Sequence, residues 1–357
     1  MKQTGKRIFN IAAPAIFLTT LTLLYNVDQT QGIVSLETEV RKPKEITVTF
    51  YNVENLFDTI NDPEKQDDDF TPDGKYGWNT ARYQEKTTKL AEAIAATGEG
   101  DLPALVGLCE VENEAVLTDL AASPALAAGG YGIVHYTSLD VRGIDVALLY
   151  RKKLFTPRHE ETLFVNLGSD KRPTRDILYV SGTLNGKKGP LLHVFINHWP
   201  SRYGGQEKSE PNRKAAASVL REAVDAILTA DPNAAVIAMG DFNDYPDNVS
   251  ISEVLSAKGK DQSGLLVNLM QGEDEALRGT YNYRGEWGFL DQIMVSRSMY
   301  EGGPIMVKPG SAAPFSTPEM LFTDPKYGDE KPNRSYGGTN YYGGYSDHLP
   351  VRATLWY

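Results

Sequence analysis

Cysteine is almost absent from this 357-residue chain, in which Cys109 is the only one. A single cysteine excludes an internal disulfide and any metal site built from several thiolates. Cys109 lies in an apolar run, which indicates a packed core thiol rather than a nucleophile. Three catalytic signatures are also missing: the glycine-rich loop that cradles nucleotide triphosphates, the serine elbow of common esterases and the paired-histidine helix of zinc proteases. These absences exclude P-loop motors, such esterases and such proteases.

Positive charge is in deficit as well. The chain has 36 lysines and arginines against 47 aspartates and glutamates, a formal net charge of −11. Proteins that bind long nucleic acids over a whole face are usually basic, so tight and non-specific duplex binding is disfavoured. A nuclease remains compatible with this charge, because bound cations offset a cluster of carboxylates and a substrate can be steered locally.

The amino terminus combines positive charge with an apolar stretch. Lys2, Lys6 and Arg7 precede residues 8–25, an apolar segment interrupted by Pro14 and several threonines. This order is typical of an export signal, while the proline and threonines make the segment a poor permanent membrane span. We therefore expect a protein that a bacterium exports to the periplasm or secretes, or one that an uncleaved segment anchors to the membrane.

These features predict three parts of the chain. Residues 1–32 form a signal peptide or membrane anchor with its tether, residues 33–45 a linker, and residues 46–357 a large folded domain.

Six short islands of carboxylate, amide and histidine residues recur along the folded domain, nearly all beside apolar runs. In chain order they contain Asn52, Glu110, His198, Asp241 with Asn243, Asp291, and Asp347 with His348. The neighbouring runs, residues 46–51, 105–109, 191–196 and 235–239, are typical of buried strands. Burying so many polar groups is costly unless they bind one another or a metal. The islands therefore predict one site assembled at strand ends.

The apolar periodicities predict a layered fold. Helical spacing marks residues 80–97, 113–120 and 207–228, and strand patterns occupy much of the remaining domain. Two clusters of strands with helices at separate points favour an α/β (α+β) protein: a four-layer α/β/β/α sandwich of two packed mixed sheets flanked by helices. The size allows one large domain or two small ones, and the convergence that the islands require favours one.

The ordered islands resemble the endonuclease/exonuclease/phosphatase superfamily over about residues 46–357. Each island alone is a weak signal, whereas all six in this order are specific. The resemblance implies a four-layer sandwich with its site at the strand ends between the sheets, and it makes residues 46–357 a catalytic domain. Sister families with the same residues cut DNA, phospholipid head groups or phosphorylated inositols, because loops rather than the fold choose the substrate.

The resemblance also implies a metal site. Glu110 corresponds to the principal metal-ligating glutamate, Asn52 to the asparagine that supports the metal or phosphate, and Asp347 to a second acidic group. Mg²⁺ is the expected cation, with Mn²⁺ or Ca²⁺ as alternatives, because such a cation needs few carboxylates and keeps its waters. Glu54 and Glu112 share strand faces with these residues and could assist, but we interpret them as solvated loop residues.

Catalytic roles follow from the same resemblance. Asp241 and Asn243 are two residues apart and can point the same way. Asp241 would orient or deprotonate the attacking water, and Asn243 would donate to the transition-state oxygens. His348 would pair with Asp291, and His198 would donate to a phosphate oxygen or the leaving group. Whether Asp241 or His348 takes the proton of water stays open. The neighbouring Asp244 is interpreted as a turn residue.

Substrate contacts are expected from arginines and tyrosines. Arg142 and Arg202 could clamp a phosphate, and Asp145 could orient His198. Tyr345 and its neighbours in the glycine-rich stretch 327–345, which we expect to overhang the site, could stack on bases, although a loop packed on itself is an equal alternative. Further cations could track a phosphate backbone, but a solvated face is the default interpretation: Arg151, Lys152, Lys153, Lys171, Arg172, Arg175, Arg213 and Lys214.

These residues predict divalent-metal-dependent hydrolysis of phosphodiester bonds by in-line attack of an activated water, without a covalent intermediate. DNA or RNA is the first expected substrate. An exported phosphodiesterase or phosphatase acting on small molecules or phospholipids is the alternative that the acidic charge favours. A catalytically silent binding module is the third hypothesis, although no island is lost. We expect a monomer without an obligate protein partner.

Overall fold

The computed structural model describes residues 43–271, 278–325 and 328–357. The predicted signal segment and nearly all of the predicted linker lie outside the described residues. All elements below belong to one compact unit, Glu45–Tyr357. Within the described ranges, no helix is both long and apolar enough to cross a membrane.

The first sheet is built around the first long strand. β1 (Glu45–Leu56) pairs in parallel with β2 (Leu105–Val111) and antiparallel with β20 (Val351–Trp356), which brings the last strand beside the first. The order is β14 (Met306–Val307), β20, β1, β2, β4 (Asp145–Arg151) and β3 (Tyr131–His135), and β15 (Ala313–Pro314) also pairs with β20.

The second sheet holds seven strands. Their order is β5 (Phe155–Leu163), β6 (Ile177–Leu184), β7 (Leu191–His198), β8 (Ala235–Asp241), β13 (Asp291–Ser296), β10 (Leu266–Asn268) and β9 (Ala257–Lys258). The central strands β7 and β8 run parallel, joined through the long helix α3 (Gln206–Ala230), whereas β13 runs antiparallel to β8. The sheet is therefore mixed, like the first.

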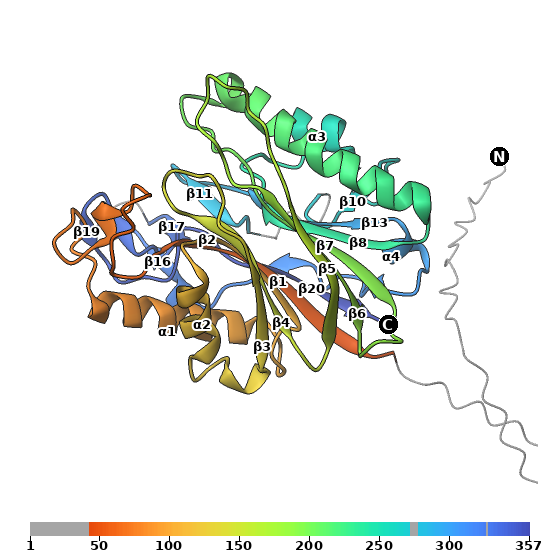
Figure 1. The fold of residues 1–357 in the computed structure, drawn as a ribbon, viewed down its shortest axis with the longest axis horizontal. Coiled ribbons are helices and arrows are strands. Elements are labelled where there is room, and N and C mark those ends of the chain that lie inside the picture. Colours follow the sequence, from red (N-terminus) through yellow and green to blue (C-terminus); the bar gives the residue numbers. More distant parts are fainter. Residues whose placement is uncertain (1–42, 272–277, 326–327) are drawn as a thin grey trace, which may run out of the picture. The chain divides into compact units, whose positions relative to one another are not determined.

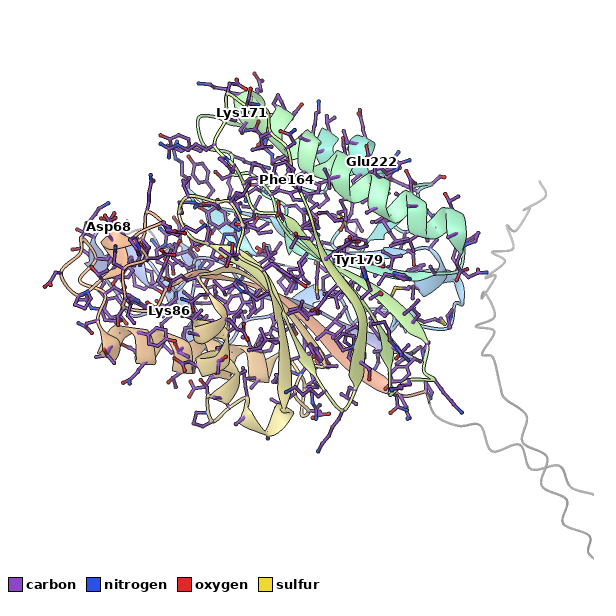
Figure 2. All side chains as sticks on the ribbon, in the orientation of Figure 1. Asp68, Lys86, Phe164, Lys171, Tyr179 and Glu222 are labelled. Atoms are coloured by element: carbon purple, nitrogen blue, oxygen red, sulfur yellow. The ribbon has the colours of Figure 1, made fainter. Side chains whose placement is uncertain are left out.

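Helices cover the outer face of each sheet (Figure 1). A cluster of buried residues joins α1 (Thr80–Ala96) and α2 (Glu114–Ala122) to the first sheet, and another joins α3 and the π-helical turn Ser250–Leu255 to the second. The largest cluster draws on the inner faces of both sheets, whose intervening space is filled by side chains (Figure 2). These layers confirm the predicted four-layer α/β/β/α sandwich, and each predicted helix lies within two residues of the observed one.

Short elements complete the unit. They are the 3₁₀ turns Asp68–Phe70, Ala127–Gly129 and Pro318–Met320, the helix α4 (Ser298–Glu301), and three strand pairs: β11 (Tyr281–Tyr283) with β12 (Glu286–Gly288), β16 (Leu321–Thr323) with β17 (Glu330–Pro332), and β18 (Tyr336–Gly337) with β19 (Asn340–Tyr341).

Candidate active site

Three neighbouring strands of the second sheet carry polar residues in one row. His198 at the end of β7 lies opposite Asp241 at the end of β8, and Asp241 lies opposite Asp291 at the start of β13. Ile196 and Met239, two positions earlier on their strands, belong to the core between the sheets. Because side chains alternate along a strand, the row continues that inner face. The sequence pattern thus delivers three polar groups to one edge of the sandwich interior.

The first sheet contributes Asn52 to the same place. Its amide Nδ2 donates to Asp241 Oδ2 (3.1 Å), and its Oδ1 accepts the backbone N–H of Glu54 (3.0 Å). The hydroxyl of Ser346 donates to the carbonyl of Asn52 (2.7 Å), which ties down the segment that leads into β20. Asn52 therefore joins the two sheets and restricts how the Asp241 carboxylate can turn.

Glu110 reaches the site through a bulge in β2. The register between β2 and β4 shifts between Cys109 and Val111, and Glu110 itself has a left-handed backbone (φ 63°). Its Oε2 accepts the N–H of Asn55 (3.0 Å), and its Oε1 lies 3.9 Å from His198 Nε2. A positive φ is uncommon and unfavourable for a residue with a side chain. Here it accompanies a glutamate that lines the cavity between the sheets.

His348 is held by Asp291. The distance from its Nδ1 to Asp291 Oδ2 is 2.7 Å, and both side chains are buried. An ionised carboxylate only accepts, so Nδ1 carries the proton and Nε2 is turned towards Asp241 Oδ2, 3.9 Å away. The ring of Tyr281 packs against the imidazole with 4.8 Å between ring centroids. The pairing expected from the resemblance is present in the structure.

Asn243 is fixed by the turn after β8. Its backbone, with φ 50°, places its N–H on Asp241 Oδ1 (2.9 Å), and its Nδ2 donates to the carbonyl of Trp199 (3.0 Å). Arg202 donates from Nε to the carbonyl of Asn243 (2.8 Å) and lies over the ring of Tyr245, 4.1 Å from its centroid. The two islands Asn197–Pro200 and Gly240–Asp244 therefore fold as one polar unit.

Several of these residues line one cavity of about 610 Å³. Its walls include Glu110, His198, Asp241, Asn243, Asp347 and His348, the arginines Arg142 and Arg202, and the tyrosines Tyr245, Tyr281 and Tyr283. Gly205 and Gln206, where α3 begins, also line it, and no side chain caps this helix end. Open N–H groups of a first helical turn favour an anion. The cavity thus combines carboxylates with groups that attract a phosphate.

Burial raises the pKa values of the central carboxyl groups. It raises the pKa of Asp241 to about 6, with His348 opposing and Asp291 and Glu110 adding to the effect. It also raises the pKa of Glu110, and the negative charge of Asp347 adds to that shift. Carboxylates this close destabilise one another unless a cation lies near them.

The two histidines are shifted in opposite directions. Burial lowers the pKa of His198 well below its usual value, and the charges of Arg175 and Arg142 add to this effect. Burial works in the same direction on His348, but the charge and hydrogen bond of Asp291 outweigh it and raise the pKa of His348 well above its usual value. These opposite shifts favour the neutral form of His198 and the protonated form of His348.

The donor set fits a hard divalent cation. Glu110 and Asp347 face one cavity with few other ligands, and Asn52 lies behind them on β1. Oxygen donors in small number, with room for waters, suit Mg²⁺, Mn²⁺ or Ca²⁺. Cys109, His198 and Asp241 also bring possible ligand atoms within 4.8 Å of one another. Burial raises the pKa of the Cys109 thiol well above its usual value, which disfavours the thiolate as a ligand.

Two of the three expected substrate contacts lie at the cavity. Arg142 lines it with a side chain that is 50% exposed, and Arg202 lines it as well. Tyr345 does not: its ring packs on the α1 side of the first sheet, where the amine of Lys89 lies 6.0 Å from the ring centroid. The expectation for Tyr345 is corrected, because its ring packs with the buried cluster of the first sheet and not at the cavity.

Two further tyrosines of this loop, Tyr336 and Tyr341, pack on the protein. Tyr336 contacts the rings of Tyr76 and Trp78, and the guanidinium of Arg82 lies 4.5 Å from the ring centroid of Tyr341. This is the packed alternative rather than a loop that overhangs the site. The aromatic groups at the cavity come instead from residues 245 and 281–283. Sequence analysis missed them, although Tyr245 directly follows an island.

Several charged residues that looked solvated are buried. Glu54 is 9% exposed and accepts the N–H of Ser335 (2.6 Å), and burial raises its pKa to about 7. Asp145 does not orient His198: it pairs with His135 at 3.1 Å. Arg175 and Arg213 are buried too, so the solvated-face interpretation is wrong for them, while Asp244, also buried, lies in the bend that follows β8. Burial of a charge depends on partners distant in the chain, which a local pattern does not reveal.

Comparison with known proteins identifies the family of this chain. A model of the Endonuclease/Exonuclease/phosphatase family matches residues 47–356, which confirms the resemblance seen in the sequence. No curated protein matches the chain.

Solved structures share the fold. An endonuclease/exonuclease/phosphatase family protein from Bacteroides thetaiotaomicron is 19% identical, with 88% of this chain and 99% of that chain covered and a TM-score of 0.54. A mannosyl-6-phosphatase from the same species is 19% identical (87% and 99% covered, TM-score 0.55). D. rerio TDP2, complexed with single strand DNA product, is 16% identical (87% and 98% covered, TM-score 0.54). The family match spans nearly the whole described unit, so this chain belongs to the endonuclease/exonuclease/phosphatase family and is a phosphoric ester hydrolase.

Proposed function

We propose that this chain hydrolyses phosphodiester bonds of nucleic acids with the help of a divalent cation, through direct attack of water on phosphorus. One observation carries the proposal. Glu110, His198, Asp241 and His348 line one cavity large enough for a phosphodiester, and the buried Asn52 and Asp291 hold Asp241 and His348 from behind by hydrogen bonds.

Glu110 and Asp347 would hold the cation, with Asn52 supporting them from β1. A bound divalent cation supplies Lewis acidity, which polarises the phosphoryl oxygens and offsets charge at phosphorus. Arg334 Nη2 donates to Asp347 Oδ2 (2.8 Å). This bond leaves the other oxygen, Oδ1, for the cation.

Asp241 is the proposed base for the attacking water. Two hydrogen bonds hold its carboxylate, from the Asn52 amide and the Asn243 backbone, while Oδ2 stays within 3.7 Å of His198 and 3.9 Å of His348. A pKa of about 6 leaves Asp241 ionised at neutral pH yet basic enough to accept a proton. His348, which is protonated through Asp291, is then a donor to a phosphate oxygen rather than a competing base.

The remaining donors would stabilise charge in the transition state. His198 and Asn243 approach from the ends of β7 and β8, and Arg142 approaches from the segment before β4. Fixed donors of this kind act most strongly in a site that excludes water, and loss of one typically costs about 10²–10³-fold in turnover. No serine or cysteine nucleophile is needed.

Nucleic acid is the proposed substrate because aromatic rings and arginines surround the same opening. Tyr245, Tyr281 and Tyr283 can stack on bases, and Arg142 and Arg202 can bind phosphates. The net charge of −11 favours single strands or short ends over long duplexes. The fold shared with TDP2 in its complex with a single strand DNA product supports this choice.

A phosphatase or phosphodiesterase acting on small molecules is the second candidate. The acidic charge of the chain favours it, and a mannosyl-6-phosphatase shares the fold. Both candidate functions use the same catalytic groups, and they differ in the part of the substrate that carries the phosphate: a nucleic acid or a small molecule.

The deciding experiment offers the purified protein single-stranded oligonucleotides, plasmid DNA, bis-p-nitrophenyl phosphate and a sugar monophosphate, each with Mg²⁺, Mn²⁺, Ca²⁺ or EDTA. We expect cation-dependent cleavage of the oligonucleotide that Glu110→Gln abolishes. The matched control is Glu222→Gln, which alters an exposed glutamate on α3 (Figure 2). Hydrolysis of the sugar phosphate alone would move the function to the second candidate, and equal activity of Glu110→Gln would refute the mechanism.

A further inference from the structure

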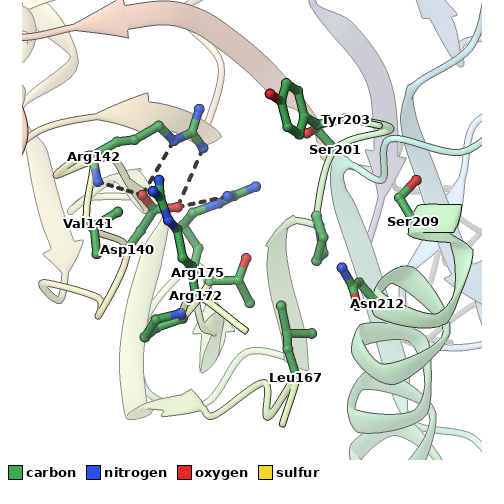
Figure 3. Close-up of a pocket in the computed structure, with 13 residues that line it drawn as sticks. Asp140, Val141, Arg142, Leu167, Arg172, Arg175, Ser201, Tyr203, Ser209 and Asn212 are labelled. Atoms are coloured by element: carbon green, nitrogen blue, oxygen red, sulfur yellow. Dashed lines mark hydrogen bonds and ion pairs between the residues drawn. The ribbon is translucent and has the colours of Figure 1, made fainter. Parts of the chain in front are cut away.

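A second cavity lies beside the catalytic one and has a volume of about 430 Å³. Three segments form it: residues 140–142 before β4, the loop between β5 and β6, and the connection from β7 into the first turns of α3 (Figure 3). Lys171 Nζ donates to Asn212 Oδ1 (2.5 Å), which ties the β5–β6 loop to α3. This bond joins two of the three segments, and the bond of Arg175 to Asp140 joins the β5–β6 loop to the third.

The two cavities share a wall. Arg142 and Ser201 line both of them. A chain that enters the catalytic cavity with one phosphate can thus continue past Arg142 into the second cavity. Neither Glu110 nor Asp241 nor either catalytic histidine lines the second cavity, so its chemistry is separate from the bond-breaking step.

The charge of the second cavity is positive in a protein that is otherwise acidic. Its lining holds three arginines and one aspartate, a local balance of +2. The charge of Asp140 is paired within the protein: Arg175 Nη1 donates to its Oδ2 (2.9 Å), and Arg142 Nε lies 3.4 Å from its Oδ1 (Figure 3). Arg172 is exposed and has no hydrogen bond or ion pair within the described parts of the chain. The arrangement leaves one free guanidinium for an anion.

The other walls suit a flat ring. Leu167, Pro173 and Pro200 are apolar, and the side chain of Tyr203 is 94% exposed at the rim. An aromatic side chain that is almost wholly exposed gains nothing from burial in the protein and is available for stacking. A guanidinium and a ring together match the phosphate and the base of a nucleotide.

We propose that this second cavity is a subsite for the nucleotide next to the scissile phosphodiester, with Arg172 binding its phosphate and Tyr203 stacking on its base. This inference rests on the nuclease function proposed above. It predicts a preference for single-stranded substrates, because a base must leave the duplex stack to meet Tyr203. It also predicts that kcat/KM rises with length until the second cavity is filled.

The test measures kcat/KM for p-nitrophenyl thymidine 5′-phosphate and for oligothymidylates of two, four and eight nucleotides. Arg172→Ala and Tyr203→Ala should each lower kcat/KM for the four- and eight-nucleotide substrates by roughly fivefold or more. Both should leave hydrolysis of bis-p-nitrophenyl phosphate unchanged. Arg158→Ala and Tyr342→Ala are the matched controls, since both side chains are exposed and neither lines either cavity.

The salt dependence of kcat/KM distinguishes phosphate binding by Arg172 from base stacking by Tyr203. If Arg172 binds a phosphate, the plot of log kcat/KM against log salt for the eight-nucleotide substrate becomes shallower by about 0.7 in Arg172→Ala. Tyr203→Ala should keep the wild-type slope, and Arg172→Lys should restore it. A wild-type slope in Arg172→Ala, or unchanged length dependence in both variants, would overturn the subsite while leaving the nuclease function standing. Failure of the wild-type protein to cleave any oligonucleotide would instead overturn the nuclease function itself.

Discussion

Asp241 and Asp244 are three residues apart and both are buried, yet their surroundings are opposite. Arg213 Nε lies 2.7 Å from Asp244 Oδ2, and Ser250 and Gln206 donate to its two oxygens at 2.6 and 2.9 Å. The donors to Asp241 are neutral amides, and the imidazoles of His198 and His348 lie 3.7 and 3.9 Å from its Oδ2. One carboxylate is fully paired inside the protein. The other, Asp241, has no arginine or lysine partner among the described residues and faces the cavity, where it can interact with substrate, water or a cation.

This difference teaches how to separate a structural from a catalytic carboxylate. A buried ion pair is costly to break, because the partner left behind is an uncompensated charge. A buried carboxylate beside other carboxylates is already destabilised, and its removal relieves repulsion. Loss of Asp241 should therefore harm chemistry and spare the fold, whereas loss of a partner of Asp244 should do the reverse.

The largest expected effect is on catalysis. Asp241→Asn removes the proposed base and should lower kcat by about 10²–10⁴-fold or more, and Glu110→Gln should act similarly. The melting temperature of both variants should equal or exceed that of the wild type. Turnover of an oligonucleotide and thermal unfolding of the same preparations test this. If Asp241→Asn keeps near-normal turnover, or loses much of its stability, then Asp241 is a structural carboxylate like Asp244.

Next in size is the paired carboxylate. Arg213→Met leaves Asp244 buried without its main cation and should cost roughly 3–5 kcal/mol in unfolding free energy. Adding Asp244→Asn should recover part of that loss, because the uncompensated charge is gone, and the two changes should not add. Guanidinium unfolding of the single and double variants measures the coupling. If the double variant departs from the sum of the single variants by less than about 0.5 kcal/mol, the two residues do not stabilise each other.

A smaller effect concerns the cation. Mg²⁺ that binds only the folded protein should stabilise it by about 2.7 kcal/mol at a concentration 100-fold above its Kd. Glu110→Gln should lose most of this gain, whereas Arg213→Met should keep it, since its defect lies outside the cation site. Thermal unfolding with increasing Mg²⁺, against NaCl of equal ionic strength, provides the measurement. An equal gain in Glu110→Gln would place the cation elsewhere.

Much of the fold and the site could be predicted because both follow local rules. Alternation along β7, β8 and β13 places His198, Asp241 and Asp291 on the inner face, and the pattern is visible in the sequence. The ends of strands are where such residues meet. The islands also predict Asn52 and His348 as site residues, although the sequence alone does not show which of their atoms form hydrogen bonds.

The rest depends on contacts between distant segments. Glu110 reaches the cavity only because β2 bulges, and nothing in its residue type signals a left-handed backbone. Arg213 and Arg175 look like surface cations until Asp244 and Asp140, far away in sequence, neutralise them in the interior. The position of Tyr345 depends on such a contact too, since its ring packs with the cluster that includes residues of α1.

The smallest expected effect tests Asp140, the paired carboxylate that lines the second cavity. Burial works to raise the pKa of Asp140, but the charges of Arg175 and Arg142 outweigh it and hold this pKa below its ordinary value of 3.8. Because the folded state prefers the ionised form, the pair contributes stability above about pH 4 and loses it as the pH falls through the lower folded pKa. Asp140→Asn should therefore be less stable than the wild type at pH 7, and the gap should close in more acidic solution.

Exposure of Arg142 limits the gain from that partner, so the gap should be smaller than that of Arg213→Met. A gap that stays constant between pH 7 and pH 3 would show that Asp140 acts through hydrogen-bond geometry alone, and the pairing of Asp140 would then differ in kind from that of Asp244.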